Sequence, residues 1–304
     1  MEARGATDGE RKTITALFAD IKGSMDMIED LDPEEARSLF DPALNLMMEA
    51  VHRYEGYVAQ STGDGIFAFF GAPIAHEDHP QRALYAALRM QEEMKKYADK
   101  LRLEGKAPIQ IRVGANTGEM VLRSIRKDDL HADYTPIGHS TSLASRMEGL
   151  ATPGSVVVSE HTYKLAEGYF EFKSLGAARV KGVSEPVHIY EVLGVGPLRT
   201  RLQVSAKRGL VQFVGRQGEM QQLQQALTLA KEGHGQIVAA MGEPGVGKSR
   251  LFHEFKLLSQ TGCLLLETFS VSHGKAYAYL PLIELKCGHG ENFVVGELPA
   301  GVPA

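Results

Sequence analysis

The sequence predicts an α+β fold, in which helices pack on a mostly antiparallel β-sheet, followed by part of an α/β unit. The order strand, helix, two strands, helix, strand over residues 13–115 is typical of this class. Two apolar runs, at 57–61 and 66–70, flank TGDG and signal a β-hairpin. A glycine-rich loop, GEPGVGKS at 242–249, follows the apolar run 236–241 and indicates the second unit.

The elements of the first unit follow from local signals. Residues 13–19 form an apolar strand that ends at Asp20. A helix is expected from Pro33 to about Arg53, with Asp32 as its N-cap in a capping box with Glu35. The later elements are a helix over 84–101, strands at 109–115 and 119–124 around a turn at 116–118, a helix over 139–150, and strands at 155–159 and 187–192.

Composition limits the functional classes. The chain has 304 residues, 43% apolar and 23% charged, which suits two globular domains. A net charge of −5 gives no reason to expect nucleic acid as a partner. Two cysteines, no signal-peptide pattern and no apolar run near the ~20 residues of a membrane span predict a soluble cytoplasmic protein without membrane insertion.

Two motifs carry the first functional signal. FADIKG at 18–23 and TGDG at 62–65 each place a carboxylate at a strand end beside glycine. Such a pair suits two divalent ions that hold a nucleotide triphosphate. HEDH at 76–79 is interpreted instead as helix-capping acids and exposed histidines, because zinc normally takes at least three protein ligands.

Four further motifs agree with this pair in order and spacing: RVG at 112–114, YTPIG at 134–138, ASRME at 144–148 and VKG at 180–182. Together the six motifs resemble the class III adenylate/guanylate cyclase catalytic domain over residues 13–193. The resemblance implies a ferredoxin-like βαββαβ domain. It also implies Asp20 and Asp64 as metal ligands, with the Ile21 carbonyl assisting and Mg²⁺ or Mn²⁺ as the two ions.

The same resemblance implies roles for the substrate side. Backbone amides near Gly23 and Ser24 would hold phosphates, and Arg112 and Lys181 would hold the triphosphate. Arg146 would offset the charge that develops when the ribose 3′-hydroxyl attacks the α-phosphate. Since sites of this family lie between two catalytic domains, a second copy of the chain is the expected partner.

Three positions bear on activity and substrate. Gln60 and Thr135 occupy the base-reading positions and favour ATP over GTP. Ser142 stands where the family has an asparagine that orients the ribose, which predicts reduced activity. The leading prediction is a purine nucleotide cyclase in intracellular signal transduction, converting ATP to 3′,5′-cyclic AMP and pyrophosphate at a homodimer interface. The alternatives are a guanylate cyclase, or a weakened cyclase-fold module that regulates or dimerises an attached ATPase.

The second unit carries a P-loop. Its amides would wrap the phosphates, Lys248 would reach the β and γ oxygens and Ser249 would hold Mg²⁺, the glycines being Gly242, Gly245 and Gly247. FVGR at 213–216 resembles the start of AAA/signal-transduction ATPase domains. Glu267 comes closest to a Walker B acid, but the apolar run 263–266 before it is interpreted as the second strand of the sheet, so a truncated domain is expected.

These signals predict the domain organisation. In chain order we expect a flexible N-terminus at 1–12, the catalytic domain at 13–193, a linker at 194–212, the N-terminal part of the ATPase domain at 213–286 and an irregular tail at 287–304.

Overall fold

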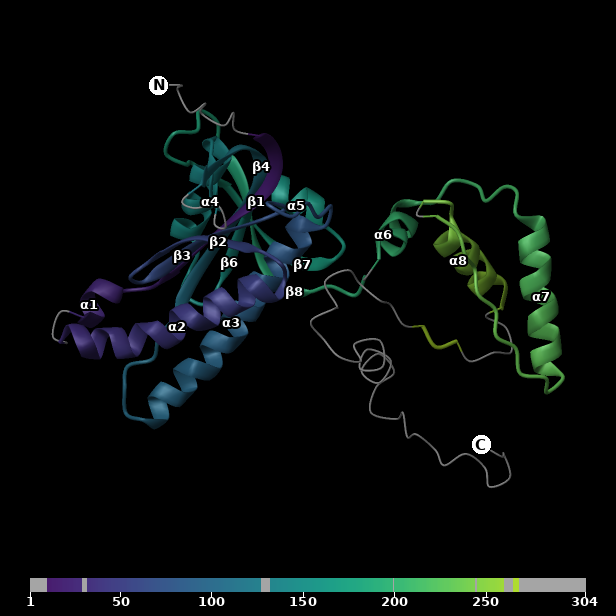
Figure 1. Cartoon of the computed structure of the whole chain (residues 1–304), viewed down its shortest axis with the longest axis horizontal. Helices are drawn as coiled ribbons and strands as arrows, with labels where there is room; N and C mark the ends of the chain where they lie inside the picture. The colour runs from purple at the N-terminus through teal and green to yellow at the C-terminus, as the bar shows by residue number, and fades with distance from the viewer. Residues whose placement is uncertain are drawn as a thin grey trace. The chain divides into compact units, whose positions relative to one another are not determined.

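The computed structural model describes residues 10–28, 32–126, 132–198, 200–243, 245–259 and 265–267. The chain divides into two compact units, Met1–Leu198 and Arg199–Ala304, and each is described by itself (Figure 1). Most of the flexible segment expected at 1–12 and all of the tail expected at 287–304 lie outside the described residues.

The first unit alternates strands and helices. Its elements are, in chain order, β1 (Glu10–Ile21), α1 (Ser24–Ile28), α2 (Pro33–Arg53), β2 (Tyr57–Thr62), β3 (Gly65–Phe70), α3 (His79–Leu103), β4 (Ile111–Arg126), β5 (Ala132–Ile137), α4 (His139–Leu150), β6 (Val156–Ser159), α5 (Glu160–Ala166), β7 (Phe170–Ala178) and β8 (Val187–Val195).

The strands form one eight-stranded sheet. Its order is β2-β3-β1-β4-β6-β8-β7, and β5 pairs with β4 outside this path. Every described pairing is antiparallel except that of β4 with β6. Strands β1 to β4 with helices α2 and α3 make the βαββαβ order, so the predicted α+β fold is confirmed.

Helices cover both faces of the central strands. On one face α2 packs on α3 and on β2 and β3, and α3 packs on β1, β3 and β4 (Figure 1). On the other face Ala144 of α4 joins a buried cluster with Ile14 and Ala16 of β1 and with Met120 and Leu122 of β4. Strand β1 is buried from Ile14 to Leu17 on both faces, and the one polar side chain of this stretch, Thr15, is hydrogen-bonded to Thr117.

The turn expected at residues 116–118 is wrong. Strand β4 pairs with β1 without interruption, from Arg112 opposite Asp20 to Leu122 opposite Glu10. A Cβ on Gly118 would overlap the Ser140 hydroxyl of α4. The glycine is therefore required by the close approach of a helix to the strand, and the same residue type misled the turn prediction.

The other predicted elements of the first unit are partly confirmed. The helices at Pro33–Arg53 and His139–Leu150 and the hairpin of β2 and β3 are confirmed. The capping box at Asp32 is wrong, since its side chain makes no cap hydrogen bond. The elements α1, β5, α5 and β7 were not predicted, and they are short or largely exposed.

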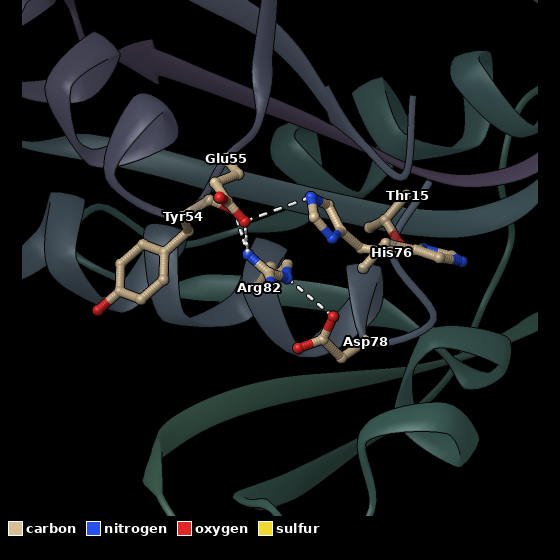
Figure 2. A network of polar contacts seen from close by, with 7 residues as sticks. Thr15, Tyr54, Glu55, His76, Asp78 and Arg82 are labelled. Atoms are coloured by element: carbon tan, nitrogen blue, oxygen red, sulfur yellow. Dashed lines mark hydrogen bonds and ion pairs between the residues drawn. The ribbon is translucent and has the colours of Figure 1, made fainter. Parts of the chain in front are cut away.

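A buried arginine organises the entry to α3 (Figure 2). The Arg82 side chain is 2% exposed; its Nη1 lies 2.6 Å from Glu55 Oε2 and its Nε 2.8 Å from Asp78 Oδ1. His76 Nε2 lies 3.3 Å from the same Glu55 oxygen. The HEDH segment thus supplies a partner of this arginine, and the exposed histidines expected there are wrong because both are partly buried.

The next histidine of that segment faces the sheet. Nδ1 of His79 and Oγ1 of Thr15 lie 2.8 Å apart. Burial lowers the pKa of His79 to about 4. His79 is therefore a neutral hydrogen-bonding side chain at neutral pH.

The second unit consists of helices among its described residues. They are α6 (Arg201–Arg208), α7 (Gln217–Lys231) and α8 (Lys248–Ser259). Helix α6 lies within the predicted linker and begins with a capping box between Thr200 and Gln203. The strand expected at 236–241 is wrong, because no described strand pairs with it and Ile237 and Met241 are almost fully exposed.

Among the described residues, no helix combines the length and the apolar character needed to cross a membrane.

Removing Arg82 should destabilise the first unit strongly. We expect Arg82→Leu to lower the free energy of unfolding by about 3 kcal/mol, because Glu55 and Asp78 would lose the cation that they share. Urea unfolding followed by circular dichroism measures this. The matched control is Arg89→Leu on the same helix, whose side chain is 30% exposed beside Glu92 and Glu93; its cost should stay below about 1 kcal/mol. Equal losses would contradict the role of burial.

Candidate active site

Two carboxylates meet at one edge of the central sheet. Asp20 is the last residue but one of β1, where it lies opposite Gly65 of β3 on one side and Arg112 of β4 on the other. Asp64 lies in the turn that joins β2 to β3. The Ile21 amide donates a 2.9 Å hydrogen bond to the Asp64 carbonyl, which ties that turn to the end of β1. The structure thus brings the two acids to the same place from distant parts of the sequence.

The residue beside Asp64 must be glycine. A Cβ on Gly65 would lie 2.7 Å from the Ala19 carbonyl oxygen and 2.9 Å from Asp20 Oδ1. Either contact would displace backbone or the carboxylate itself. Glycine at this position therefore lets the hairpin approach Asp20 closely.

The loop after β1 closes over the second acid. Gly23 has a φ of +71°, a left-handed conformation that favours glycine, and it leads into α1. Ser24 Oγ at the start of α1 donates a 2.5 Å hydrogen bond to Asp64 Oδ2. The Lys22 amide donates to the Gln110 carbonyl at 2.9 Å, so this amide is already used within the fold. Ile21, Gly23, Ser24 and both aspartates therefore form one continuous site.

A guanidinium lies between the carboxylates. Arg112 Nη2 is 3.2 Å from Asp20 Oδ2 and 2.7 Å from Glu148 Oε1 of α4. The Arg112 Nε atom is buried and has no hydrogen-bond partner among the described residues. Glu148 was not among the predicted site residues, although it belongs to the ASRME motif. The structure brings it beside β4 because Gly114, which has no side chain, admits the α4 backbone.

The site carries more negative than positive charge. Burial, together with the nearby Asp64 carboxylate, raises the pKa of Asp20 in spite of the opposing effect of Arg112. Burial also raises the pKa of Glu148, again against the effect of Arg112. Arg112 pairs with Asp20 and Glu148, and burial disfavours the ionised forms of these two carboxylates. A further cation would relieve this cost.

The donor atoms fit a hard divalent ion. Asp20 and Asp64 offer carboxylate oxygens and Ile21 a carbonyl oxygen, which are the ligand types that Mg²⁺ and Mn²⁺ prefer. Among the described residues, no group of three or more His, Cys, Asp or Glu side chains is placed to hold a metal. An ion at the two aspartates therefore needs further oxygens from backbone, water or a bound phosphate.

The remaining predicted residues lie apart from the aspartates. Ser142 and Arg146 are exposed one helical turn apart on α4. Met147, which follows Arg146, packs in a buried cluster with Val180, which precedes the exposed Lys181. Arg146 and Lys181 are therefore the sequence neighbours of two residues that share one buried cluster. No described contact joins them, or Ser142, to the aspartates.

The base-reading positions are on strands. Gln60 is exposed on β2, opposite Phe67 of β3. The Thr135 backbone pairs with Arg123 in β5, and its side chain lies outside the described residues. No described contact joins Gln60 to the aspartates.

The P-loop lysine folds over its own loop. Lys248 Nζ donates to the carbonyls of Gly242 at 2.7 Å and Glu243 at 2.8 Å. Arg216 from the FVGR segment donates to the Val246 carbonyl at 2.9 Å. Gly245 and Gly247 have positive φ, and Ser249 follows Lys248 into α8.

Comparisons with known proteins agree with both units. The adenylate and guanylate cyclase catalytic domain matches residues 7–194, and an AAA ATPase domain matches residues 212–294. Adenylate cyclase 1 of Rhizobium meliloti (strain 1021) is 32% identical over 187 residues, which are 61% of this chain and 28% of that protein. The chain spans about a quarter of the length of the first curated relatives, 28% and 24%.

Solved structures show the same likeness. The adenylyl cyclase CyaB from P. aeruginosa is 32% identical with a TM-score of 0.57, covering 61% of this chain and 96% of that one. The guanylyl cyclase Cya2 is 29% identical with a TM-score of 0.57, covering 63% and 96%.

Because the pKa of Asp20 is raised, we expect the replacement of this side chain to stabilise the fold, by an amount that depends on pH. The folded chain holds this proton more tightly than the unfolded chain, whose Asp20 titrates near 3.8, so stability falls as pH rises above that value. Without metal, Asp20→Asn should therefore melt at a higher temperature than the wild type at pH 7. The two melting temperatures should converge below about pH 4.

Thermal melts in EDTA across this pH range provide the measurement. Asp99→Asn on α3, an exposed aspartate paired with Arg102, is the control and should show no such crossover. A less stable Asp20→Asn at pH 7 would mean that the pair with Arg112 outweighs burial and the repulsion from Asp64.

Proposed function

The chain belongs to the family of adenylate and guanylate cyclase catalytic domains, and on this premise we propose that it converts ATP to 3′,5′-cyclic AMP and pyrophosphate. The observation that carries the proposal is the meeting of Asp20 and Asp64 at one sheet edge, with Ser24 and Arg112 in contact with them. The 32% identity with an adenylate cyclase over most of this unit favours ATP, and GTP is the alternative substrate.

Asp20, Asp64 and the Ile21 carbonyl would hold two Mg²⁺ or Mn²⁺ ions. When bound, the ions supply charge neutralisation on the triphosphate and activate the ribose 3′-hydroxyl. The excess of carboxylates at the site supports this assignment, because their raised pKa values are what a cation would reverse.

The chain's own cation completes the phosphate contacts. Arg112 lies within reach of both Asp20 and Glu148 and keeps one unpartnered donor at Nε. It can turn from Asp20 toward a phosphate oxygen while Glu148 retains it at the site. The amides of Gly23 and Ser24 would add backbone contacts, since the Ile21 and Lys22 amides bond within the fold.

The other half of the site would come from a second copy. Arg146 and Lys181 are exposed and make no described contact with the aspartates of their own chain. In a head-to-tail homodimer Arg146 would stabilise the charge that develops on the α-phosphate, and Lys181 would hold the leaving pyrophosphate. Gln60 and Thr135 of the same half would contact the base.

A second candidate function rests on Ser142. This side chain lies one turn before Arg146 and is too short to replace the asparagine of the family in holding the ribose. The cyclase unit would then act mainly as a regulatory or dimerisation module for the unit that matches an AAA ATPase domain.

A direct assay separates the two candidates. The purified chain should form cyclic AMP from Mn²⁺-ATP, with a lower rate for cyclic GMP from Mn²⁺-GTP. Asp20→Ala should reduce the rate by at least about a hundredfold, because one metal would lose its carboxylate. Asp99→Ala, which removes an exposed aspartate of α3, is the control and should retain the wild-type rate. No cyclic product from either nucleotide would leave only the regulatory role.

A further inference from the structure

Helix α4, which carries the proposed catalytic Arg146, is held against β4 by a row of specific contacts, here called the α4 seat. Alternate residues of this strand face α4, and each one meets a particular point of the helix. Arg112 pairs with Glu148 near the helix end. Gly114 and Gly118 have no side chain where one would overlap the backbone at Glu148 or the Ser140 hydroxyl. The helix is thereby fixed along its whole length against one strand.

Asn116 is the polar side chain at the centre of the α4 seat, between Gly114 and Gly118 of β4. It is 2% exposed, and both ends of its amide are used. Nδ2 donates to the Ser140 carbonyl at 2.9 Å, in the first turn of α4. Oδ1 accepts from Ser159 Oγ at 2.6 Å, at the end of β6. The amide therefore joins the start of α4 to the sheet at a point where no other described side chain bonds the helix backbone.

Ser159, the partner of Asn116 on β6, is held in place by further hydrogen bonds. Ser159 is the N-cap of α5 and accepts from the Thr162 amide. Thr162 Oγ1 donates to Thr117 Oγ1 at 3.2 Å, and the Thr117 hydroxyl lies 2.9 Å from that of Thr15. These buried hydroxyls tie β6, α5, β4 and β1 together. Ser159 therefore cannot drift without breaking several bonds, which makes it a fixed reference for Asn116.

We propose that Asn116 is a positioning residue that aims Arg146. The inference rests on the cyclase reaction proposed above. Ser140 lies in the turn that leads to Ser142 and then to Arg146, so a shift at Ser140 moves the whole exposed face of α4. A catalytic group displaced by about 1 Å can lose about a hundredfold in rate. Asn116 touches neither substrate nor metal in this account, and its effect passes entirely through the helix.

The test compares Asn116→Leu with Tyr97→Phe. Asn116→Leu keeps the branched shape of the side chain and removes both hydrogen bonds; we expect kcat for Mn²⁺-ATP to fall about ten- to hundredfold, with KM within about threefold of the wild type. Tyr97→Phe is the control, because its hydroxyl donates to the Leu39 carbonyl at 3.0 Å between α3 and α2 and bonds neither α4 nor the hydroxyls that hold Ser159. It should lower the melting temperature and leave kcat unchanged. An equal fall of kcat in both variants would overturn the inference.

A double-mutant cycle shows whether the effect passes through Arg146. In an Arg146→Lys background, which has already lost the guanidinium, Asn116→Leu should reduce kcat by less than about threefold. A full loss in both backgrounds would overturn the inference and leave the cyclase reaction intact. Arg146→Lys with the wild-type rate would instead overturn the proposed role of Arg146, and this inference with it.

Ser159→Ala serves if Asn116→Leu does not fold. It removes the bond to Asn116 Oδ1, the α5 cap and the contact with the Thr162 hydroxyl, and it should lower kcat in the same direction with the same dependence on Arg146. A Ser159→Ala variant with unchanged kcat would count against the proposal.

Discussion

The pairing of β1 with both of its neighbours is the constraint on which the site depends. This strand is hydrogen-bonded to β3 on one side and to β4 on the other, so Asp20 acquires Gly65 and Arg112 as its cross-strand partners. The buried Thr15 holds the register, because a slip by one residue would turn its hydroxyl to the opposite face, away from His79 and Thr117. With the register fixed, the β2–β3 hairpin places Asp64 beside Asp20. The packing of α4 on β4 places Glu148 beside Arg112.

The site that results is electrostatically unfavourable without a cation, and that is informative. Asp20 and Glu148 share one guanidinium, Asp64 adds its charge near Asp20, and burial raises the pKa of Asp20 and of Glu148. This excess of carboxylate over guanidinium suits the binding of metal and triphosphate.

Sequence predicted best where local chemistry and packing demand the same residue. Asp20 and Asp64 stand at strand ends beside glycine, and α2 and α4 begin and end where their periodicity indicates. It failed where a distant element decided the residue type. Asn116 and Gly118 look like a turn, but their chemistry is set by α4 crossing β4. Glu148 and the Arg82 network could not be predicted either, because ion pairs between residues far apart in sequence produce no recognisable local pattern in the sequence.

The central claim is that two copies of the chain share the proposed cyclase site, one supplying Asp20 and Asp64 and the other Arg146 and Lys181. Mixing Asp20→Ala with Arg146→Ala tests it most directly, since each variant alone lacks one half of every site. Random exchange would give mixed dimers with one intact site each, and the account predicts recovery of about a quarter of the wild-type rate. No recovery, although both variants fold and exchange subunits, would contradict a shared site.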